Sequence, residues 1–572
     1  MHAMSNRYDL KSVKMPKLKG RALAAYGSLA HTAFPGGLLR HKLLADGGLL
    51  RARTEPVAEP PTFTPRGPAP AASTESAAAP APALDAIHAP RPTSSPYASA
   101  LDYAKAFREG RTTPLAVAEA VLEAVDASEA LSPPMRGWIA LDRDDVRSQA
   151  AAATERYKRG APLGPLDGVP ATVKDEFDQV PYPSTAGTSF LGALRKPKAD
   201  ATIVARLRAA GVVLVGKTNM HEIGIDPSGL NAHHGQARNP FDPRCDTGGS
   251  SSGSAAAVGA GIVPFALGAD GGGSIRVPAA LCGVVGLKPT FGRVSEAGAV
   301  PLCSSVGHAG PIGSCVEDVA LAYAVIAGPD PLDANTSGQP AVSVDGAGAA
   351  DLRGVRLGVY QAWFEHADPQ VVQANRRMLE ALGKAGAEVR EVEVPDLDLM
   401  RVAHAITILT EMEAFVAATP DRRHLLGDSV KLTLEATREM RSSDYVWAQR
   451  VRTRALANFA KIYSEVDALV TPTTGIVAPV IPEVARGQAW TDLGSTIEVM
   501  RFVVPGNFCG LPAISFPVGH EQGGLPIAMQ AMAAHWNEAL LLRIARVAEL
   551  NCERRAPARF WCPLDKAAAK RG

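Results

Sequence analysis

Two segments rich in glycine and serine decide the fold of this sequence: Thr247-Gly248-Gly249-Ser250-Ser251-Ser252-Gly253-Ser254 and Gly268-Ala269-Asp270-Gly271-Gly272-Gly273-Ser274-Ile275-Arg276. Flexible linkers would have the same composition, but apolar sequence bridges the two segments at 255–266 and continues from Val277. Glycine runs inside a core indicate tight turns or a close approach of the backbone to a ligand. The consecutive N–H groups of residues 271–274 could form a nest for an oxyanion, with Ser274 placed to attack.

A serine nucleophile needs a base, and neither segment contains a histidine. A lysine can serve when burial lowers its pKa, since desolvation disfavours the ammonium form. The run Val169-Pro170-Ala171-Thr172-Val173-Lys174 places Lys174 at the end of an apolar, strand-like stretch. Most lysines are solvated, so this run by itself carries little weight.

The composition excludes several classes of protein. The 572 residues allow about two to four domains. Lys plus Arg is 59 against 58 for Asp plus Glu, and 46% of residues are apolar, which predicts a soluble globular protein and neither a basic nucleic-acid binder nor a disordered chain. The seven cysteines form no C-x-x-C pair, which favours a reducing, cytoplasmic setting. No apolar run reaches the length of a membrane span, about 18 residues.

The first hundred residues differ from the rest. Residues 1–54 carry ten Lys or Arg and two acids, a net charge of +8, so the remaining chain carries −7. This segment could lie on an anionic membrane surface as a peripheral contact, or form helices that pack on the main domain. Residues 55–96 are rich in Pro and Ala, which predicts an extended linker. The catalytic body is expected to span 97–572.

Helix and strand signals alternate along the body. A helix is predicted over 202–210, ended by Gly211 and followed by a buried strand at 212–215. A second unit consists of a strand at 355–360, a helix from Asp368-Pro369 to about Ala385, and a strand over 388–394. Repetition of this order predicts an α/β fold with a largely buried sheet.

Three motif matches in this chain do not fit their usual structural context. Residues 211–218 match a phosphate-binding P-loop in letters, but the four middle residues are themselves a predicted strand. Residues 249–253 match a nucleophile elbow with Ser251 as nucleophile, but a turn-rich loop precedes them instead of an apolar strand. His221-Glu222 has no second histidine at position 225, and His233 and His234 are interpreted as ordinary histidines rather than metal ligands.

The two segments quoted first, together with Gly168-Val169-Pro170 and Val173-Lys174-Asp175, resemble the amidase signature family. Asn219-Met220-His221-Glu222 and Val470-Thr471-Pro472-Thr473-Thr474-Gly475 make the resemblance strongest to its plant fatty acid amide hydrolase branch. It covers about 97–547. The resemblance implies an α/β amidase signature fold, in which helices cover both faces of a large mixed central β-sheet.

The resemblance also assigns roles to residues. It makes Ser274 the nucleophile, Lys174 the base and Ser250 the bridge between them, with a cis peptide bond at Gly249-Ser250. The N–H groups of the oxyanion hole would be those of Gly271, Gly272, Gly273 and Ser274. Asp270 and Arg276 would support the loop structurally, and the substrate-binding residues by family position would be Met220, Ile476 and Met529. No metal and no organic cofactor is implied.

The function expected from this resemblance is hydrolysis of fatty acid amides or N-acylethanolamines through an acyl-enzyme. One alternative is a general amidase acting on short-chain, aryl or carbamate substrates. Others are an amidotransferase subunit, which would need partner subunits, and a non-catalytic lipid-binding relative. The expected partners are a lipid-like amide substrate, a membrane surface and a second copy of the chain in a homodimer, but no nucleic acid.

Overall fold

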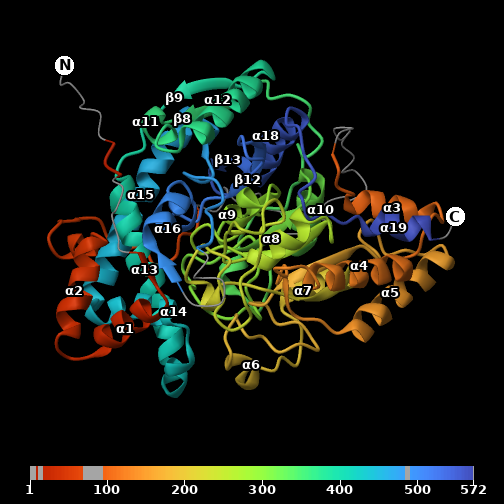
Figure 1. The fold of residues 1–572 in the computed structure, drawn as a ribbon. Helices are drawn as coiled ribbons and strands as arrows, with labels where there is room; N and C mark the ends of the chain where they lie inside the picture. Colours follow the sequence, from red (N-terminus) through yellow and green to blue (C-terminus); the bar gives the residue numbers. More distant parts are fainter. Residues whose placement is uncertain (1–7, 11–16, 68–94, 483–489, 571–572) are drawn as a thin grey trace.

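A mixed sheet of 11 strands forms the centre of the molecule in the computed structural model, which describes residues 8–10, 17–67, 95–482 and 490–570 (Figure 1). Across the sheet the strands are β2 (Trp138–Ala140), β4 (Val213–Thr218), β3 (Pro170–Lys174), β5 (Phe265–Ala269), β7 (Ala309–Gly313), β6 (Val285–Lys288), β12 (Ala513–His520), β13 (Pro526–Ala533), β10 (Ala468–Pro472), β8 (Arg356–Val359) and β9 (Glu388–Glu391). β3 is parallel to both β4 and β5, whereas β12 and β13 are antiparallel. The expected α/β fold with a mixed sheet is confirmed.

Helices cover both faces of this sheet. Every residue of β3, β5, β10 and β13 is buried, and successive side chains of a strand point to opposite faces. The central helices α8 (Ser252–Gly259) and α9 (Arg276–Leu281) begin within the last residues of the two Gly/Ser segments and pack on β5 and β12 respectively. The remaining helices around the sheet are α3 (Ala100–Arg108), α4 (Pro114–Glu129), α5 (Arg143–Lys158), α6 (Leu191–Leu194), α7 (Thr202–Ala209), α10 (Val316–Ile326), α11 (Gln361–Phe364), α12 (Pro369–Lys384), α18 (Glu538–Leu550) and α19 (Pro563–Ala569).

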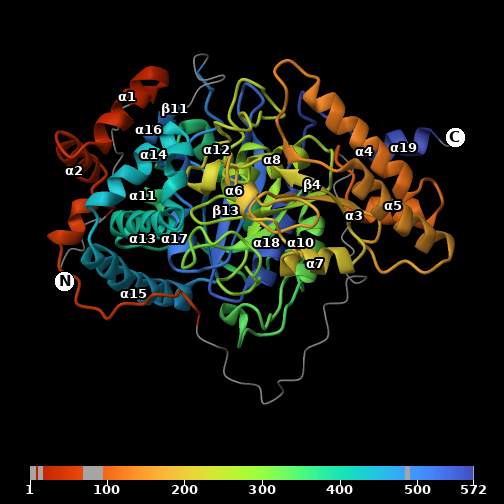
Figure 2. The ribbon, with the colours of Figure 1, turned by 90° about the horizontal axis from the view of Figure 1, so that it is seen from below.

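A second group of helices lies at the opposite end of the molecule from α3–α5 and α19 (Figure 2). It comprises α13 (Leu397–Ala417), α14 (Asp428–Glu435), α15 (Ser442–Glu465), α16 (Leu493–Met500) and α17 (Val504–Phe508). α13 packs against α15 and also against α17, which brings this group next to the loop that follows β5. The site described below therefore lies between the sheet and this helical group.

The predicted strand-helix-strand units are present, with small differences at their ends. α7 is followed by Gly211 with φ +83° and then by β4, as the pattern predicts. α12 begins at Pro369, but the carboxylate of Asp368 makes no capping hydrogen bond. The strand predicted over 388–394 ends at Glu391, because β9 is an edge strand that pairs only with β8.

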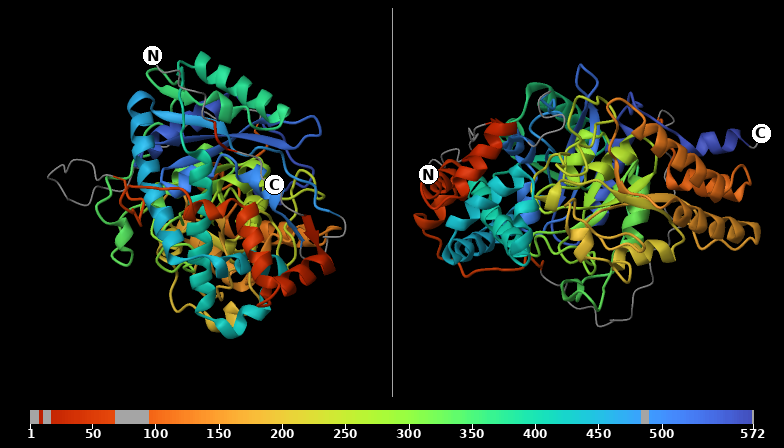
Figure 3. Two further views of the ribbon diagram at one scale, coloured as in Figure 1. Left: turned by 90° about the vertical axis from the view of Figure 1, so that its left-hand side faces the viewer. Right: turned by 60° about the horizontal axis from the view of Figure 1, so that its bottom comes forward.

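The basic N-terminal segment packs on the body through two helices. α1 (Gly20–His31) lies against α14, and α2 (Gly36–Asp46) lies against the 3-10 turn Ala436–Glu439 (Figure 3). A short strand, β1 (Lys17–Lys19), pairs antiparallel with β11 (Trp490–Asp492). Three arginines form ion pairs with acids of the body: Arg40 with Glu439, Arg51 with Asp398 and Arg53 with Asp444. Part of the +8 charge is thus neutralised by the body, while residues 1–7 and 11–16 lie outside the described ranges.

The segment expected to be a linker is fixed on the body in its first part. Residues 55–63 run along α15, where Trp447 Nε1 donates to the Glu55 carbonyl at 2.8 Å and the Thr62 N–H donates to the Gln449 carbonyl at 3.0 Å. Arg452 Nη1 also donates to the Phe63 carbonyl at 2.6 Å. This corrects the expected start of the linker at residue 55. A Pro-rich backbone does not form its own secondary structure, so its polar groups need other partners, and α15 supplies them. Residues 68–94 lie outside the described ranges.

Candidate active site

The amine of Lys174 is fully surrounded by acceptors at the end of β3. Its Nζ donates to Ser250 Oγ at 2.9 Å and to the Ala269 carbonyl at 3.3 Å, and it forms an ion pair with Glu176 Oε2 at 2.7 Å. The Lys174 side chain is 1% exposed. The lysine reaches the Ala269 carbonyl because β3 and β5 are parallel neighbours, so that their carboxyl ends lie at the same edge of the sheet.

Ser250 and Ser274 share a small cavity with this lysine. The cavity measures about 10 Å³, and its walls also include Glu176, Gly224 and Cys303. The peptide bond Gly249–Ser250 is cis, as the resemblance implies. The Ser274 carbonyl accepts a hydrogen bond from the Ser251 N–H at 3.3 Å, which ties the two Gly/Ser segments together. The three polar side chains singled out in the sequence therefore line one cavity, although they are 76 and 24 residues apart.

The loop from Asp270 to Ser274 is shaped by the buried Asp270 carboxylate. Asp270 Oδ1 accepts from the Gly273 N–H at 2.6 Å, and Oδ2 accepts from the Ile275 N–H at 3.0 Å. Gly273 has φ +115°, and a Cβ there would lie 2.6 Å from Val503 Cγ2, so only glycine fits. This corrects the expectation of four N–H groups available to an oxyanion. The Gly273 N–H is already used, which leaves those of Gly271, Gly272 and Ser274 for such a role.

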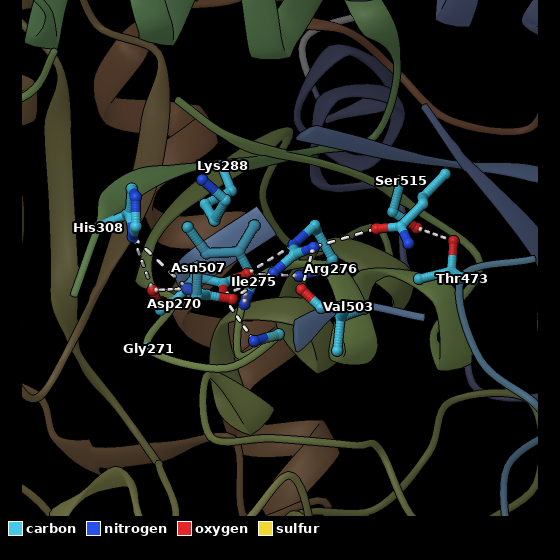
Figure 4. Close-up of polar contacts among 12 residues, drawn as sticks. Asp270, Gly271, Ile275, Arg276, Lys288, His308, Thr473, Val503, Asn507 and Ser515 are labelled. Carbon is cyan, nitrogen blue, oxygen red and sulfur yellow. Dashed lines mark hydrogen bonds and ion pairs between the residues drawn. The ribbon is translucent and has the colours of Figure 1, made fainter. Parts of the chain in front are cut away.

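A hydrogen-bond network of buried side chains also holds this loop (Figure 4). Arg276 Nε donates to Asp270 Oδ2 at 3.1 Å, and Arg276 Nη1 donates to the Val503 carbonyl at 2.9 Å and to Gln530 Oε1 at 3.0 Å. Asn507 Nδ2 donates to the Asp270 carbonyl at 2.7 Å. Burial acts to raise the pKa of Asp270, but the Arg276 guanidinium, together with Lys288 and the Asn507 amide, holds that pKa well below the usual range. Asp270 and Arg276 thus place their charged groups in hydrogen bonds to the loop and its neighbours.

His404 on α13 supports the same loop from the other side. Its Nε2 lies 2.8 Å from the Gly271 carbonyl, so this nitrogen carries the proton that is donated. Burial lowers the pKa of His404 to about 4; the Gly271 carbonyl opposes this shift and the charge of Arg452 adds to it. The imidazole is thus neutral at physiological pH and acts as a fixed hydrogen-bond donor.

The three residues expected to bind substrate by family position do not line the cavity of Lys174, Ser250 and Ser274. Met220 is buried in a cluster with Leu302 and Cys303, both of which line that cavity. Ile476 is half-buried beside Val277 and Val503, next to the loop. Met529 lies further away in the main core, because its position on β13 pairs with β10 on one side and β12 on the other.

The motif matches judged misleading have structural roles. Lys217 of the P-loop match is buried in β4, where its Nζ donates to the Phe177 carbonyl and pairs with Asp175 at 3.3 Å. Ser251 of the elbow match is buried and donates to the Ala269 carbonyl at 3.2 Å. His233 Nε2 lies 2.7 Å from Glu222 Oε1. Within the described ranges, no three His, Cys, Asp or Glu side chains are arranged to hold a metal ion.

Sequence reasoning missed three of the site's polar residues: Glu176, His404 and Asn507. The one signal for Glu176 is its position two residues after Lys174. His404 and Asn507 lie 133 and 237 residues from the loop positions that they contact, on helices whose pattern predicts ordinary packing. Only folding brings them to the loop.

Comparison with known proteins fits this geometry. The family model "Amidase" matches residues 119–542. The chain belongs to the amidase signature family. It is 42% identical over 475 residues to a fatty acid amide hydrolase from Medicago truncatula, covering 80% of this chain and 77% of that protein. A fatty acid amide hydrolase from Arabidopsis thaliana is 36% identical, covering 97% of this chain and 96% of its own length.

A solved structure shows the same fold. The peptide amidase PAM in complex with the competitive inhibitor chymostatin superposes with a TM-score of 0.69 at 30% identity, covering 80% of this chain and 98% of that one. The amidase signature chain described here is accordingly a hydrolase that acts on amide bonds. Within its described ranges, no helix is long and apolar enough to cross a membrane.

Proposed function

We propose that this amidase hydrolyses N-acyl amides with an apolar acyl chain, with Ser274 as nucleophile, Ser250 as bridge and Lys174 as base. The observation that carries the proposal is the contact of Lys174 Nζ with Ser250 Oγ at 2.9 Å, at a cavity that Ser274 also lines. The contact supports Lys174 as the base that receives a proton from Ser250, and the shared cavity supports Ser274 as the nucleophile.

In the proposed first step, Ser274 Oγ attacks the amide carbonyl while Ser250 takes its proton and passes its own to neutral Lys174. The N–H groups of Gly271, Gly272 and Ser274 would stabilise the oxyanion, each by about 3 kcal/mol. The proton returns through Ser250 to the leaving amine, which gives an acyl-enzyme and a free amine. Water then attacks the ester by the same relay and releases the acid.

An apolar cavity beside the loop supports a substrate with an apolar part. It measures about 140 Å³, and Leu10, Leu397, Ile497, Met500 and Val504 line it together with His404. Met500 Cε and His404 Cε1 each lie 3.0 Å from the position that a Cβ of Gly272 would take, so the cavity wall adjoins the oxyanion loop. An engineered cavity of roughly 150 Å³ holds benzene, so a long chain would extend beyond this volume.

The nucleophile is tested by intact-mass analysis after reaction with a fluorophosphonate. We expect one adduct on the wild-type chain and none on Ser274→Ala. Labelling that persists in Ser274→Ala would assign the nucleophile elsewhere, with Ser250→Ala and Ser251→Ala as the next variants. The same assay separates a catalyst from a lipid-binding relative, which would not be labelled at all.

The substrate class is tested by kcat/KM of the purified chain on N-acylethanolamines of increasing acyl length. We expect a rise of roughly 0.8 kcal/mol in transition-state binding per buried CH₂. A flat or falling profile would contradict the fatty-amide assignment. Activity of the isolated chain on simple amides would also argue against an amidotransferase that needs partner subunits.

A second cavity favours a different candidate, a general amidase for small polar amides. It measures about 40 Å³, and the polar side chains of His221, Asp226, Ser429 and Thr496 line it together with apolar ones such as Leu281 and Val499. It adjoins the site because the His221 N–H donates to the Ser250 carbonyl at 3.2 Å. Higher kcat/KM on short polar amides than on long acyl amides would favour this candidate.

We also propose that the connection between α1 and α2 contacts a membrane surface. Phe34 is 79% exposed, Leu38 64% and Leu29 43%, which groups three apolar side chains on one exposed turn. The exposed Lys42 and His31 flank them. Exposed apolar side chains beside a lysine suit the interface of an anionic bilayer.

Sedimentation with vesicles of phosphatidylserine and phosphatidylcholine tests this contact. We expect binding that increases with the anionic lipid and is lost in Phe34→Ser/Leu38→Ser. Leu332→Ser is the matched control, since Leu332 is 81% exposed outside this turn. Equal binding of all three chains would contradict the proposal. The homodimer remains a prediction, which sedimentation velocity can check.

A further inference from the structure

The environment of Lys174 contains one feature that the proposed relay does not explain. Its three acceptors are Ser250 Oγ, the Ala269 carbonyl and the Glu176 carboxylate, one for each proton of an ammonium group. A base needs a lone pair directed at Ser250, which the ammonium form lacks. Burial disfavours that ammonium form, whereas a carboxylate 2.7 Å away favours it.

We propose that Glu176 positions the Lys174 amine on Ser250 and that its negative charge sets the pH at which this amine loses its proton and Ser274 becomes reactive. Glu176 is then a positioning residue and exchanges no proton with the substrate. This inference rests on the proposed function, because it takes Lys174 as the base of the relay.

The geometry makes Glu176 the carboxylate in direct contact with the amine. The Glu176 side chain is 10% exposed, and its backbone is fixed because its carbonyl accepts from the Val300 N–H at 2.9 Å. Both Glu176 and Lys174 line the cavity that holds Ser250 and Ser274. A carboxylate held this rigidly restricts the amine to one position, which is what a relay over two serines requires.

Other ionisable groups face the pair from separate segments: Asp270 after β5, Glu296 and Cys303 before β7, and Glu411 on α13. Asp270 is neutralised by Arg276. Burial, together with the charges of Glu176, Asp333 and Glu411, raises the pKa of Glu296 to about 8, so it is neutral at pH 7. Burial likewise holds the pKa of the Cys303 thiol well above its usual range, so this thiol is uncharged.

Glu411 is a carboxylate of the same region that does not touch the lysine. It accepts from the Ser305 N–H and from the Tyr445 hydroxyl, each at 3.0 Å. Glu411→Gln therefore separates the general field of the acidic groups from the direct contact that Glu176 makes.

The sign of the expected effect follows from the charge. With Glu176→Gln the ammonium loses its anionic partner, so Lys174 reaches the neutral form at lower pH. The acid limb of the activity profile should move to lower pH by about 1–3 units. The glutamine oxygen still accepts from Nζ, so the rate on the alkaline plateau should stay within about tenfold of wild type, a loss comparable to one weakened hydrogen bond. Glu176→Leu removes charge and position together and should lower the plateau by about 10²-fold.

The test measures the second-order rate of fluorophosphonate labelling of Ser274 from pH 5 to 10 by intact mass, which requires no knowledge of the amide substrate. We expect the limb to move for Glu176→Gln and to stay within about 0.3 units for Glu411→Gln, a field effect too weak to rival direct contact. An unmoved limb in Glu176→Gln, or an equal movement in Glu411→Gln, would overturn the inference.

This experiment distinguishes failure of the proposed function from failure of the role proposed for Glu176. A wild-type chain that is not labelled, or a Ser274→Ala chain that is, would contradict the proposed function. Normal labelling of Ser274 with an unchanged limb in Glu176→Gln would contradict only the role of Glu176. Thermal unfolding of each variant identifies loss of fold, and Glu176→Gln keeps the test valid if Glu176→Leu does not fold.

Discussion

Two buried ion pairs flank the loop 270–276 and differ in what surrounds them. Asp270 and Arg276 are both 0% exposed, and the arginine also bonds to the Val503 carbonyl and Gln530. In the Lys174–Glu176 pair the glutamate is 10% exposed at a cavity, and the lysine contacts Ser250. Burial alone therefore does not distinguish a structural charge from a chemical one. Asp270 lines the same cavity, so the distinction lies in what the charged group contacts. Lys174 contacts the Ser250 hydroxyl, whereas Asp270 accepts from N–H groups of its own loop.

The largest expected effect is on kcat and comes from the Lys174–Glu176 pair, which contacts Ser250. Lys174→Met should lower kcat by on the order of 10³–10⁴, because a general base contributes up to about that factor. The free energy of unfolding should also fall, but by less than for a fully buried pair, because the Glu176 carboxylate that loses its partner is 10% exposed. Steady-state kinetics and urea denaturation on the same preparation check both statements. A Lys174→Met chain with wild-type kcat would remove Lys174 from the mechanism.

A change in the Asp270–Arg276 pair should act mainly on the free energy of unfolding. Arg276→Met leaves the Asp270 carboxylate buried without its cation, which should lower the free energy of unfolding by about 3–5 kcal/mol. Urea denaturation measures the loss. Asp270→Asn/Arg276→Met should recover part of it, because no unpaired charge remains. If Arg276→Met were as stable as wild type, the network in Figure 4 would not be what holds the loop.

The third prediction concerns His404 and the pH dependence of the free energy of unfolding. Because burial lowers the pKa of His404 to about 4, native His404 stays neutral while the unfolded chain takes up a proton below about 6.5. The unfolded state binds more protons in this window, so the free energy of unfolding falls as pH falls from 6.5 to 4, by up to about 3 kcal/mol. His404→Gln keeps a donor to the Gly271 carbonyl and removes this contribution.

Denaturation of both chains at pH 7 and pH 4.5 measures the difference. The wild type should lose more stability than His404→Gln between the two values. Equal losses would mean that His404 protonates as readily in the folded chain as in the unfolded one, in conflict with its burial.

An exposed pair gives the smallest effect and calibrates the others. Arg390 and Glu388 pair at 2.8 Å on the edge strand β9 with side chains 39% and 60% exposed. Arg390→Gln should leave the free energy of unfolding unchanged within the error of the urea assay, because solvent and salt screen such pairs. A clear loss in the same assay would show that β9 depends on this pair, and the ranking by burial would not hold.

Much of the fold could be predicted from the chain. Gly211 and Gly386 ended predicted helices at positive φ, and strands buried on both faces had continuous apolar runs such as residues 212–215. The linker was placed too early, because the Pro-rich composition of 55–67 gives no sign of the donors that α15 provides. The edge strand β9 was predicted too long, because a period of two residues does not reveal where a pairing partner ends.

The parts of the site that depend on local backbone geometry can be predicted from the amino-acid sequence. The glycines of the two quoted segments, Ser250, Ser274 and the lysine at the end of an apolar strand are all visible in the order of residues, because turns and strands are set by near neighbours. Other contacts of the site depend on tertiary packing and cannot be read from the sequence. The Gly273 N–H donates to Asp270, His404 and Asn507 hydrogen-bond to the loop, and Glu176 forms an ion pair with the Lys174 amine. Hydrogen bonds and ion pairs act over about 3 Å whatever the separation along the chain, so these contacts exist only once the sheet and helices have packed.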